Sequence, residues 1–387
     1  MEWSDWFDGF RCSACGKRSQ PLDPRCQSCG EPLELVDLAT ALSNVRPRST
    51  GNGYDGAADL IPFDTGDDIQ SSPGATPMIL CDWLAETSEC GTVFLKNEGA
   101  NPTGHVADRD MAVAVPLAPH LAISTVALPS PGRSGIAAAA ASGAQSLSNR
   151  VFVPARATFP SKALINVHGG NMSVVGGRYA DAHAAFVDAF EDGWLSLDPN
   201  ACPFRRFGRV LLYLELLADM DWIAPDVLVV PAARSLDIVP LISTAEACVE
   251  AGLVDHIPRF IATQPAGCAP LVDAATTDTA SVPDWKNPDT ICGELEITHQ
   301  PGMERVLELI RSTDSEAISV PDPAALEAAV QIARRTGVAP SVAGGVAAAG
   351  LTASTTVRSD ETAVVLLPGS GGLDADILRS HLMGQGE

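Results

Sequence analysis

The sequence predicts an α/β protein built on largely parallel sheets and preceded by a small zinc ribbon. Two observations support this. Short runs of β-branched and apolar residues alternate with turn residues and helical patterns along most of the chain. Near the N-terminus, two Cys-x-x-Cys pairs stand ten residues apart. The length of 387 residues allows two or three domains with substantial cores.

The two cysteine pairs predict a metal site. Tetrahedral zinc is commonly held by four thiolates supplied by two such turns, and a glycine after each pair eases the backbone turn. The expected zinc ligands are Cys12, Cys15, Cys26 and Cys29. A redox-active or metal-free loop is the alternative. The N-terminus lacks the basic start and apolar core of a secretion signal, so we expect a cytosolic chain. In such a chain, ten cysteines indicate metal ligands or free thiols and argue against a disulfide framework. We therefore expect the other six cysteines to act as small apolar residues.

The charge balance is strongly acidic. The chain has 48 acidic and 25 basic residues, a formal net charge of −23, and only four lysines. This composition predicts adaptation to high salt, where screening removes self-repulsion, with an ordinary acidic surface as the alternative. It excludes nucleic acid as the main partner, since no basic stripe is present. No apolar segment is long enough to span a membrane, and we expect a cytoplasmic protein.

Individual elements follow from the hydrophobic pattern. The expected helices are an alanine run at 137–141 and two amphipathic segments, at 303–310 and 326–333, with apolar residues at i, i+3, i+4 and i+7. A segment rich in Gly, Asn, Ser and Asp at 46–62 predicts a linker. The expected buried strands are residues 93–95, 123–128, 151–154, 227–231 and 363–367.

The most informative stretch is residues 95–111, LKNEGANPTGHVADRDM. A strand leads into the turn Asn101-Pro102-Thr103-Gly104, and Asp108-Arg109 then opens a helix. This stretch resembles the signature of threonine synthases, within the fold type II family of pyridoxal-phosphate (PLP) enzymes. In that family the turn is followed by Ser-Phe-Lys-Asp-Arg, whose lysine holds PLP as a Schiff base. Further similar segments lie at 12–30, 130–142, 201–231 and 362–374.

The resemblance implies a particular organisation. We expect a zinc ribbon at residues 1–35, a linker at 36–62, and a PLP-family domain at 63–387. The domain should consist of two unequal parallel-sheet lobes, the smaller at roughly 112–200. The ribbon should have a structural role only, as in archaeal-type threonine synthases.

The resemblance also shows what the chain lacks. The position of the cofactor lysine is Ala107, and a methyl group can be neither nucleophile nor base. Two weak catalytic candidates remain: Lys96, which matches a second family lysine, and His105, which replaces the family serine. The family phosphate loop is rich in Gly and Asn, whereas here residues 232–237 contain no glycine, and Asp237 brings a negative charge.

Three more positions bear on the cofactor. Arg133, directly after Gly132, replaces the family asparagine that bonds the ring hydroxyl. Gly369 and Ser370 survive in the last turn, where the serine could face the ring nitrogen. Arg234 replaces another asparagine. The two arginines could bind a small anion such as phosphate, or they could simply fill the cavity and pair with local acids.

We therefore expect a threonine synthase-like protein that has lost the cofactor lysine. It would be a non-catalytic binding or regulatory protein of amino-acid metabolism, acting with an active paralogue or as a homo-oligomer. An active PLP-dependent lyase using an unusual lysine is the first alternative. A small-anion-binding protein is the second.

Overall fold

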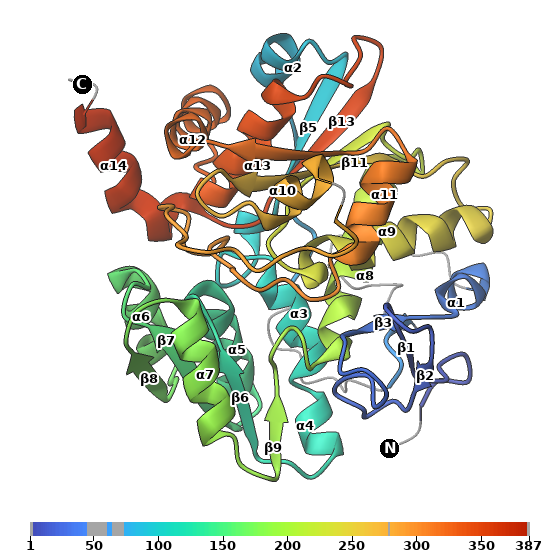
Figure 1. Ribbon diagram of the computed structural model, residues 1–387, viewed down its shortest axis with the longest axis vertical. Coiled ribbons are helices and arrows are strands. Elements are labelled where there is room, and N and C mark those ends of the chain that lie inside the picture. Colours follow the sequence, from blue (N-terminus) through green and yellow to red (C-terminus); the bar gives the residue numbers. More distant parts are fainter. Residues whose placement is uncertain (1–2, 45–59, 64–72, 278, 385–387) are drawn as a thin grey trace.

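The computed structural model describes residues 3–44, 60–63, 73–277 and 279–384. It consists of a large lobe, a smaller lobe and an N-terminal ribbon (Figure 1). Most of the expected linker lies outside the described residues. Its first part forms helix α1 (Leu38–Asn44). None of the described helices is long and apolar enough to cross a membrane.

The large lobe is built on a six-stranded sheet with the strand order β12-β11-β10-β13-β5-β4. All neighbours are parallel except the edge strand β4, which runs antiparallel to β5. The late strand β13 lies between β10 and β5, with Val365 level with both Val229 and Leu95. The carboxyl ends of these strands therefore meet, as is common at ligand sites of α/β folds. The strands are β4 (Met78–Leu80), β5 (Thr92–Asn97), β10 (Val227–Pro231), β11 (Arg259–Pro265), β12 (Glu316–Val320) and β13 (Thr362–Leu367).

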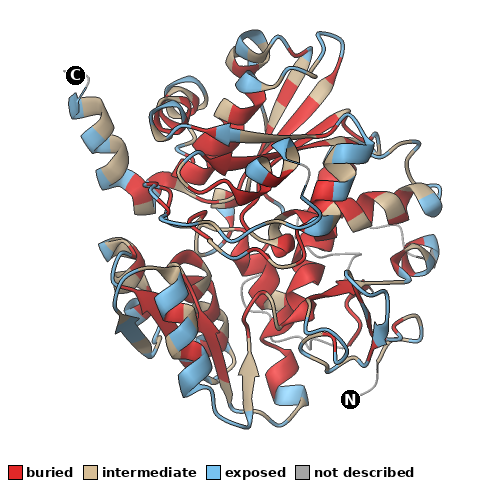
Figure 2. Cartoon of the chain, viewed as in Figure 1, coloured by how far each residue is buried: buried red, intermediate tan, exposed pale blue. Residues whose placement is uncertain are grey.

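Helices cover both faces of this sheet, and its central strands are buried (Figure 2). Both amphipathic segments predicted from the sequence are helical, as α11 and α12. Helices α12 and α13 approach closely at Gly345, where a Cβ would lie within 2.0 Å of the Ala325 carbonyl oxygen, so only glycine fits. The helices of this lobe are α2 (Asp82–Ser88), α8 (Arg206–Asp219), α9 (Ser235–Glu250), α10 (Pro270–Thr276), α11 (Glu304–Ser312), α12 (Asp322–Thr336), α13 (Val342–Ala353) and α14 (Ala375–Gly384).

The smaller lobe has a parallel four-stranded sheet with the order β8-β7-β6-β9. Helix α5 begins directly after β6 and contains the predicted alanine run. Helices α3 (Ala107–Ala114) and α4 (Leu117–His120) connect the lobes. The strands are β6 (Thr125–Pro129), β7 (Ser148–Pro154), β8 (Met172–Val175) and β9 (Trp194–Ser196), and the helices are α5 (Arg133–Ala144), α6 (Phe159–Val167) and α7 (Tyr179–Ala189).

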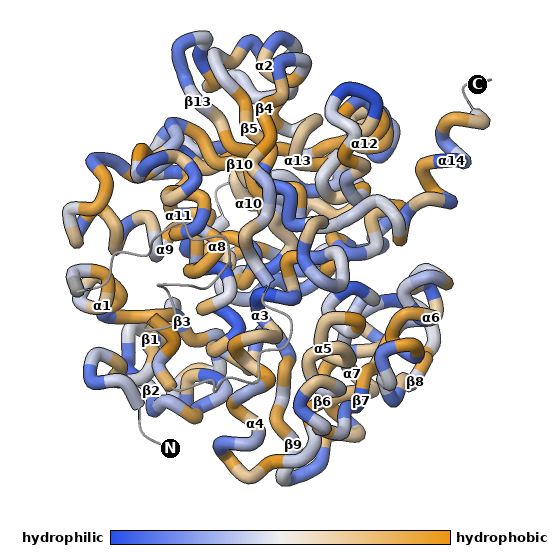
Figure 3. The backbone as a smooth tube through the Cα atoms, turned by 180° about the vertical axis from the view of Figure 1, so that it is seen from behind, coloured by the Kyte–Doolittle hydropathy of each residue, from blue (hydrophilic) through white to orange (hydrophobic). Residues whose placement is uncertain are grey.

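The N-terminal ribbon contains β1 (Phe10–Cys12), β2 (Arg18–Ser19) and β3 (Leu33–Leu35), paired antiparallel in the order β2-β1-β3. Rings from the N-terminal segment pack against the start of α8: Trp3 stacks on Phe204 at 5.6 Å between centroids, and Phe10 meets the same ring edge-on at 5.2 Å. Figure 3 shows the hydrophobic segments concentrated along the strands and inner helices. The ribbon is thus packed onto the body of the protein.

Candidate functional site

The candidate site lies where β5, β10 and β13 end and the two lobes face each other. The signature turn pairs here with the last turn of the core, because Val106 N donates to Pro368 O at 2.8 Å and Ser370 N donates to Gly104 O at 2.8 Å. A cavity of about 50 Å³ remains between the lobes, lined by Glu98, His105, Val106, Pro131, Arg133, Ser134, Arg209, Leu212, Val230, Pro231, Arg234, Asp237, Glu294, Leu295, Leu366 and Pro368. Binding sites for drug-sized ligands usually enclose about 300–1,000 Å³, so this space is small.

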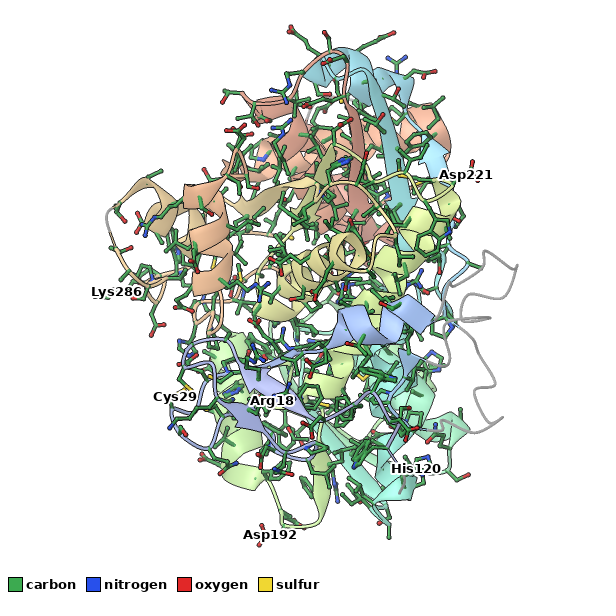
Figure 4. The ribbon with its side chains drawn as sticks, turned by 90° about the vertical axis from the view of Figure 1, so that its right-hand side faces the viewer. Arg18, Cys29, His120, Asp192, Asp221 and Lys286 are labelled. Atoms are coloured by element: carbon green, nitrogen blue, oxygen red, sulfur yellow. The ribbon has the colours of Figure 1, made fainter. Side chains whose placement is uncertain are left out.

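Ala107 is the first residue of α3 and is almost fully buried. All four lysines of the chain lie in the described residues, and none lines the cavity. Lys17 and Lys286 are exposed, and Figure 4 shows Lys286 at the edge of the molecule. The ammonium of Lys162 donates to Ala155 O at 2.9 Å. The remaining lysine is Lys96.

Lys96 is fully buried on β5 and is held in an ion-pair network. Its ammonium donates to Thr76 O at 2.8 Å, Glu215 Oε1 at 2.7 Å and Asp219 Oδ2 at 2.7 Å, which uses its three donors. Arg109, also fully buried, joins the same network by donating to Glu98 and Glu215. Burial alone would raise the pKa of Glu215, but hydrogen bonds and charge from Arg109 and Lys96 lower it to about 2. This geometry gives Lys96 a structural role.

His105 is fixed by contacts on both ring nitrogens. Its Nδ1 accepts a hydrogen bond from Ala107 N at 3.1 Å, and its Nε2 lies 3.5 Å from Glu294 Oε2. Its backbone forms an isolated bridge with Gly369. A histidine held in this way joins the signature turn to its neighbours.

The expected phosphate loop holds a carboxylate of its own. Asp237 lies in the first turn of α9, and its Oδ2 accepts hydrogen bonds from Ala233 N at 3.1 Å and Arg234 N at 2.9 Å. Backbone N–H groups at a helix N-terminus are the groups that commonly bind phosphate. Here the chain's own carboxylate takes that place, and Arg209 Nη2 lies 3.9 Å from its other oxygen.

Arg133 connects three separate segments across the interface between the lobes. Its Nε lies 2.6 Å from Glu294 Oε2, its Nη2 donates to Asp374 Oδ2 at 2.7 Å, and its Nη1 donates to Ser370 O at 2.9 Å. Burial alone would raise the pKa of Glu294, but the Arg133 charge and the His105 hydrogen bond lower it to about 2. Arg133 therefore lies between two acids, and an anion that bound it would have to compete with both carboxylates.

The second candidate arginine is also engaged. The guanidinium of Arg234 lies over the ring of Tyr179, 5.0 Å from its centroid, and so touches the smaller lobe. The two arginines thus hold the lobes together, which agrees with the interpretation that they fill the cavity and pair with nearby groups. Arg133 pairs with Glu294 and Asp374 and not with Asp237.

The remaining candidates are backbone turns. Gly132 has a φ of +142°, and a Cβ there would press on Ser161. A Cβ at Gly369 would lie 2.7 Å from the His105 ring. The Ser370 hydroxyl oxygen accepts from Gly372 N at 3.2 Å, so it caps its own turn. Gly369 and Ser370 thus shape the close contact between the two turns, and Gly132 allows the turn before α5 to approach α6.

A profile described as "Pyridoxal-phosphate dependent enzyme" matches residues 69–369. The chain belongs to the pyridoxal-phosphate dependent enzyme family. Threonine synthase of Methanocaldococcus jannaschii is 26% identical over 95% of this chain and 93% of its own length. Threonine synthase of Methanosarcina acetivorans is 27% identical over 81% and 78%, respectively. The expected resemblance to threonine synthases is confirmed.

Solved structures confirm the fold type II architecture. A fungal L-serine ammonia-lyase from Rhizomucor miehei superposes with a TM-score of 0.70 at 17% identity, covering 81% of this chain and 99% of the other. Maize serine racemase superposes with a TM-score of 0.67 at 16% identity, covering 81% and 94%. At these identities the likeness concerns the fold alone.

The residues of this family member do not fit PLP. No lysine lines the cavity, Asp237 occupies the N–H groups expected to hold the phosphate, and Arg133 with its two acids crosses the space between the lobes and leaves a cavity of only about 50 Å³. We therefore derive no chemical step that uses the cofactor.

The cysteines, in contrast, fit zinc. The four sulfur atoms lie within 4.8 Å of one another, with Cys12 Sγ 3.4 Å from Cys29 Sγ and Cys15 Sγ 3.5 Å from Cys26 Sγ. The turns after the pairs close through Gly16 and Gly30, both with positive φ, as the sequence predicts. Figure 4 shows Cys29 at the outer edge of the ribbon, and none of the four cysteines lines the interlobe cavity. A bound ion would tie the two turns together.

Sequence reasoning missed the acids that complete the site. Glu294 lies in a loop and Asp374 in a short 3-10 turn, and neither belongs to a motif. The unusual arginine after Gly132 was the available signal, because an arginine in the site would be stabilised there by acidic partners.

Proposed function

We propose that this member of the PLP family is a pseudoenzyme, a cytoplasmic binding or regulatory protein of amino-acid metabolism that performs no PLP chemistry. The observation that carries the proposal is that no lysine of the chain lines the cavity at the strand ends. Without an amine there, neither Schiff-base formation nor the associated proton transfer has a residue to perform it.

The filled site supports the same proposal. Asp237 and Arg133 are held by several contacts each, so they would have to move before a phosphate or a pyridine ring could enter. The lobes are further joined by Glu296, whose Oε2 lies 2.7 Å from Arg178 Nη1 and 3.3 Å from Arg156 Nη1. These ion pairs join the two lobes directly. A body whose lobes are joined by its own side chains suits a role in binding an active paralogue or a second copy.

Neither alternative gains support from the geometry. An active lyase would need Lys96 to leave three buried partners and reach a cavity that it does not line. A small-anion site between Arg133 and Arg234 would have to compete with Glu294, Asp374 and the Tyr179 ring.

The test is to purify the full-length protein, saturate it with PLP, and record the visible spectrum before and after borohydride. We expect no bound chromophore and no covalent adduct by mass spectrometry. The double variant Ala107→Lys/Asp237→Gly serves as the comparison, because it restores the amine and frees the N–H groups. A borohydride-stable adduct on any lysine of the unmodified chain would overturn the proposal.

A further inference from the structure

A large apolar groove lies between the zinc ribbon and the smaller lobe, and it shares no lining residue with the interlobe cavity. Its volume is about 700 Å³, within the range of about 300–1,000 Å³ typical of small-molecule sites. Residues 21–25 of the ribbon form one wall, and α7 and β9 form another. We call this the ribbon groove.

The α7–β9 wall of the ribbon groove carries three aromatic rings, of which Phe186 is buried and Phe190 is exposed. Phe186, Phe190 and Trp194 follow one another with centroid spacings of 5.4 and 6.0 Å and near-perpendicular planes. Phe190 on this wall, Val187 beside it and Leu22 opposite are all exposed. Apolar side chains exposed together on two facing walls are typical of binding sites, and aromatic rings add edge-to-face contacts for another ring.

Three side chains, those of Asp198, His183 and Arg25, meet in the groove. Asp198 is almost fully buried, and its Oδ2 bonds His183 Nε2 at 3.1 Å and Arg25 Nη2 at 3.5 Å, while its Oδ1 accepts from Asn200 N at 3.0 Å. Burial alone would raise the pKa of Asp198, but the hydrogen bonds from His183 and Asn200, with the charge of Arg25, lower it.

The remaining hydrogen-bonding capacity of these groups favours an anionic ligand. Both carboxylates of the groove are engaged, Asp198 as above and Asp23 by Gln20 N and Gln27 Nε2. Within the described part of the chain, Arg25 makes only the long contact with Asp198, and its side chain is 39% exposed. Its other N–H groups can pair bidentately with an incoming carboxylate.

We propose that the ribbon groove binds a small aromatic carboxylic acid, its ring between the α7–β9 wall and Leu22 and its carboxylate on Arg25. The ribbon then has a second role beyond structure, because residues 21–25 lie between its two cysteine pairs and form part of the site. The interlobe cavity and its missing lysine take no part, so this proposal stands independently of the pseudoenzyme assignment.

The test uses three probes with the same ring on the full-length, zinc-loaded protein: 2-naphthoate, 2-naphthylmethanol and 2-naphthylmethylamine, titrated by calorimetry. We expect 2-naphthoate to bind about tenfold more tightly than the alcohol, since a charge-assisted hydrogen bond contributes that order of affinity. The amine should bind most weakly. Arg25→Gln should reduce 2-naphthoate affinity about tenfold and leave the alcohol unchanged.

Two further variants test whether 2-naphthoate binds in the ribbon groove. Val187→Glu places a negative charge on an exposed position of the groove wall and should abolish 2-naphthoate binding. Val167→Glu makes the same change on an exposed valine of α6 that does not line the groove, and should have no effect.

Equal binding of the three probes, no 2-naphthoate binding, or binding insensitive to Val187→Glu would each overturn the proposal. A dimer in sedimentation that Val187→Glu converts to monomer would also overturn it, since a second copy would then fill the groove.

Discussion

Arg133 should be the most important single residue for joining the two lobes. It is 6% exposed and lies between Glu294 and Asp374, with a further hydrogen bond to Ser370 O. Arg133→Met fills a similar volume but leaves two buried carboxylates without a cation. Breaking a buried ion pair by removing one partner costs about 3–5 kcal/mol, mostly because the remaining charge is uncompensated. We expect a loss of unfolding free energy of this size at pH 7.

Two further measurements test the reason for this loss. Adding Glu294→Gln to Arg133→Met removes one unpaired charge and should recover part of the stability. The double variant should then lose less unfolding free energy than the sum of the losses of the two single variants. Acidification should also reduce the difference between Arg133→Met and the wild type. In the wild type, Glu294 has a pKa lowered from 4.5 to about 2, so its contribution to stability is complete above pH 4.5 and is lost progressively as the pH falls towards 2. In the variant, the unpaired acids can take up protons well above that pH.

The assay is urea unfolding followed by tryptophan fluorescence, with Arg18→Ala as the control. Arg18 also contacts two carboxylates, those of Asp8 and Asp37, but at the exposed surface, where such pairs contribute little. If Arg133→Met is no more destabilising than this control, or if acid increases the loss of unfolding free energy that it causes, the explanation by buried ion pairs between the lobes is wrong.

Four other results are expected. Ala107→Lys alone should not bind PLP in an absorbance titration, because Asp237 still occupies the N–H groups; a tightly bound chromophore would contradict this. Glu215 should contribute stability above pH 4.5 that is lost as the pH falls towards 2. The difference between its usual pKa of 4.5 and about 2 corresponds to about 3 kcal/mol, so the deficit of Glu215→Gln in acid-series urea melts should shrink below pH 4.5. Metal analysis should give one zinc per chain, and Cys12→Ser should lower this stoichiometry and release the ribbon to protease. Raising NaCl from 0.1 M to about 2 M should raise the melting temperature, because screening reduces repulsion within a chain of net charge −23; an unchanged value would refute this.

Local pattern was enough to predict most of the fold. The β-branched runs at 227–231 and 363–367 form buried strands, the two amphipathic segments form α11 and α12, and the cysteine pairs bring four sulfur atoms together. These features depend on residues close in sequence, whose side-chain periodicity or spacing alone specifies the local structure. The short edge strand β4 and the helix at 38–44 carried no such signal.

The site required the tertiary structure. The sequence showed that Ala107 has no amine and that Arg133 and Asp237 are unusual, but not what they contact. Arg133 is 161 residues from Glu294 and 241 from Asp374, and only the packing of one lobe on the other brings them within ion-pair distance.

The architecture, the cysteine cluster and the lack of a lysine at the signature turn could thus be read from the amino-acid sequence. Only the folded chain shows that Arg133 and Asp237 are paired within the site, that Lys96 lies in a buried network, and that the ribbon and the smaller lobe form a groove. The physical reason is that secondary structure follows from short-range periodicity, whereas the pairing of charges and the shape of a cavity depend on contacts between segments far apart in the chain.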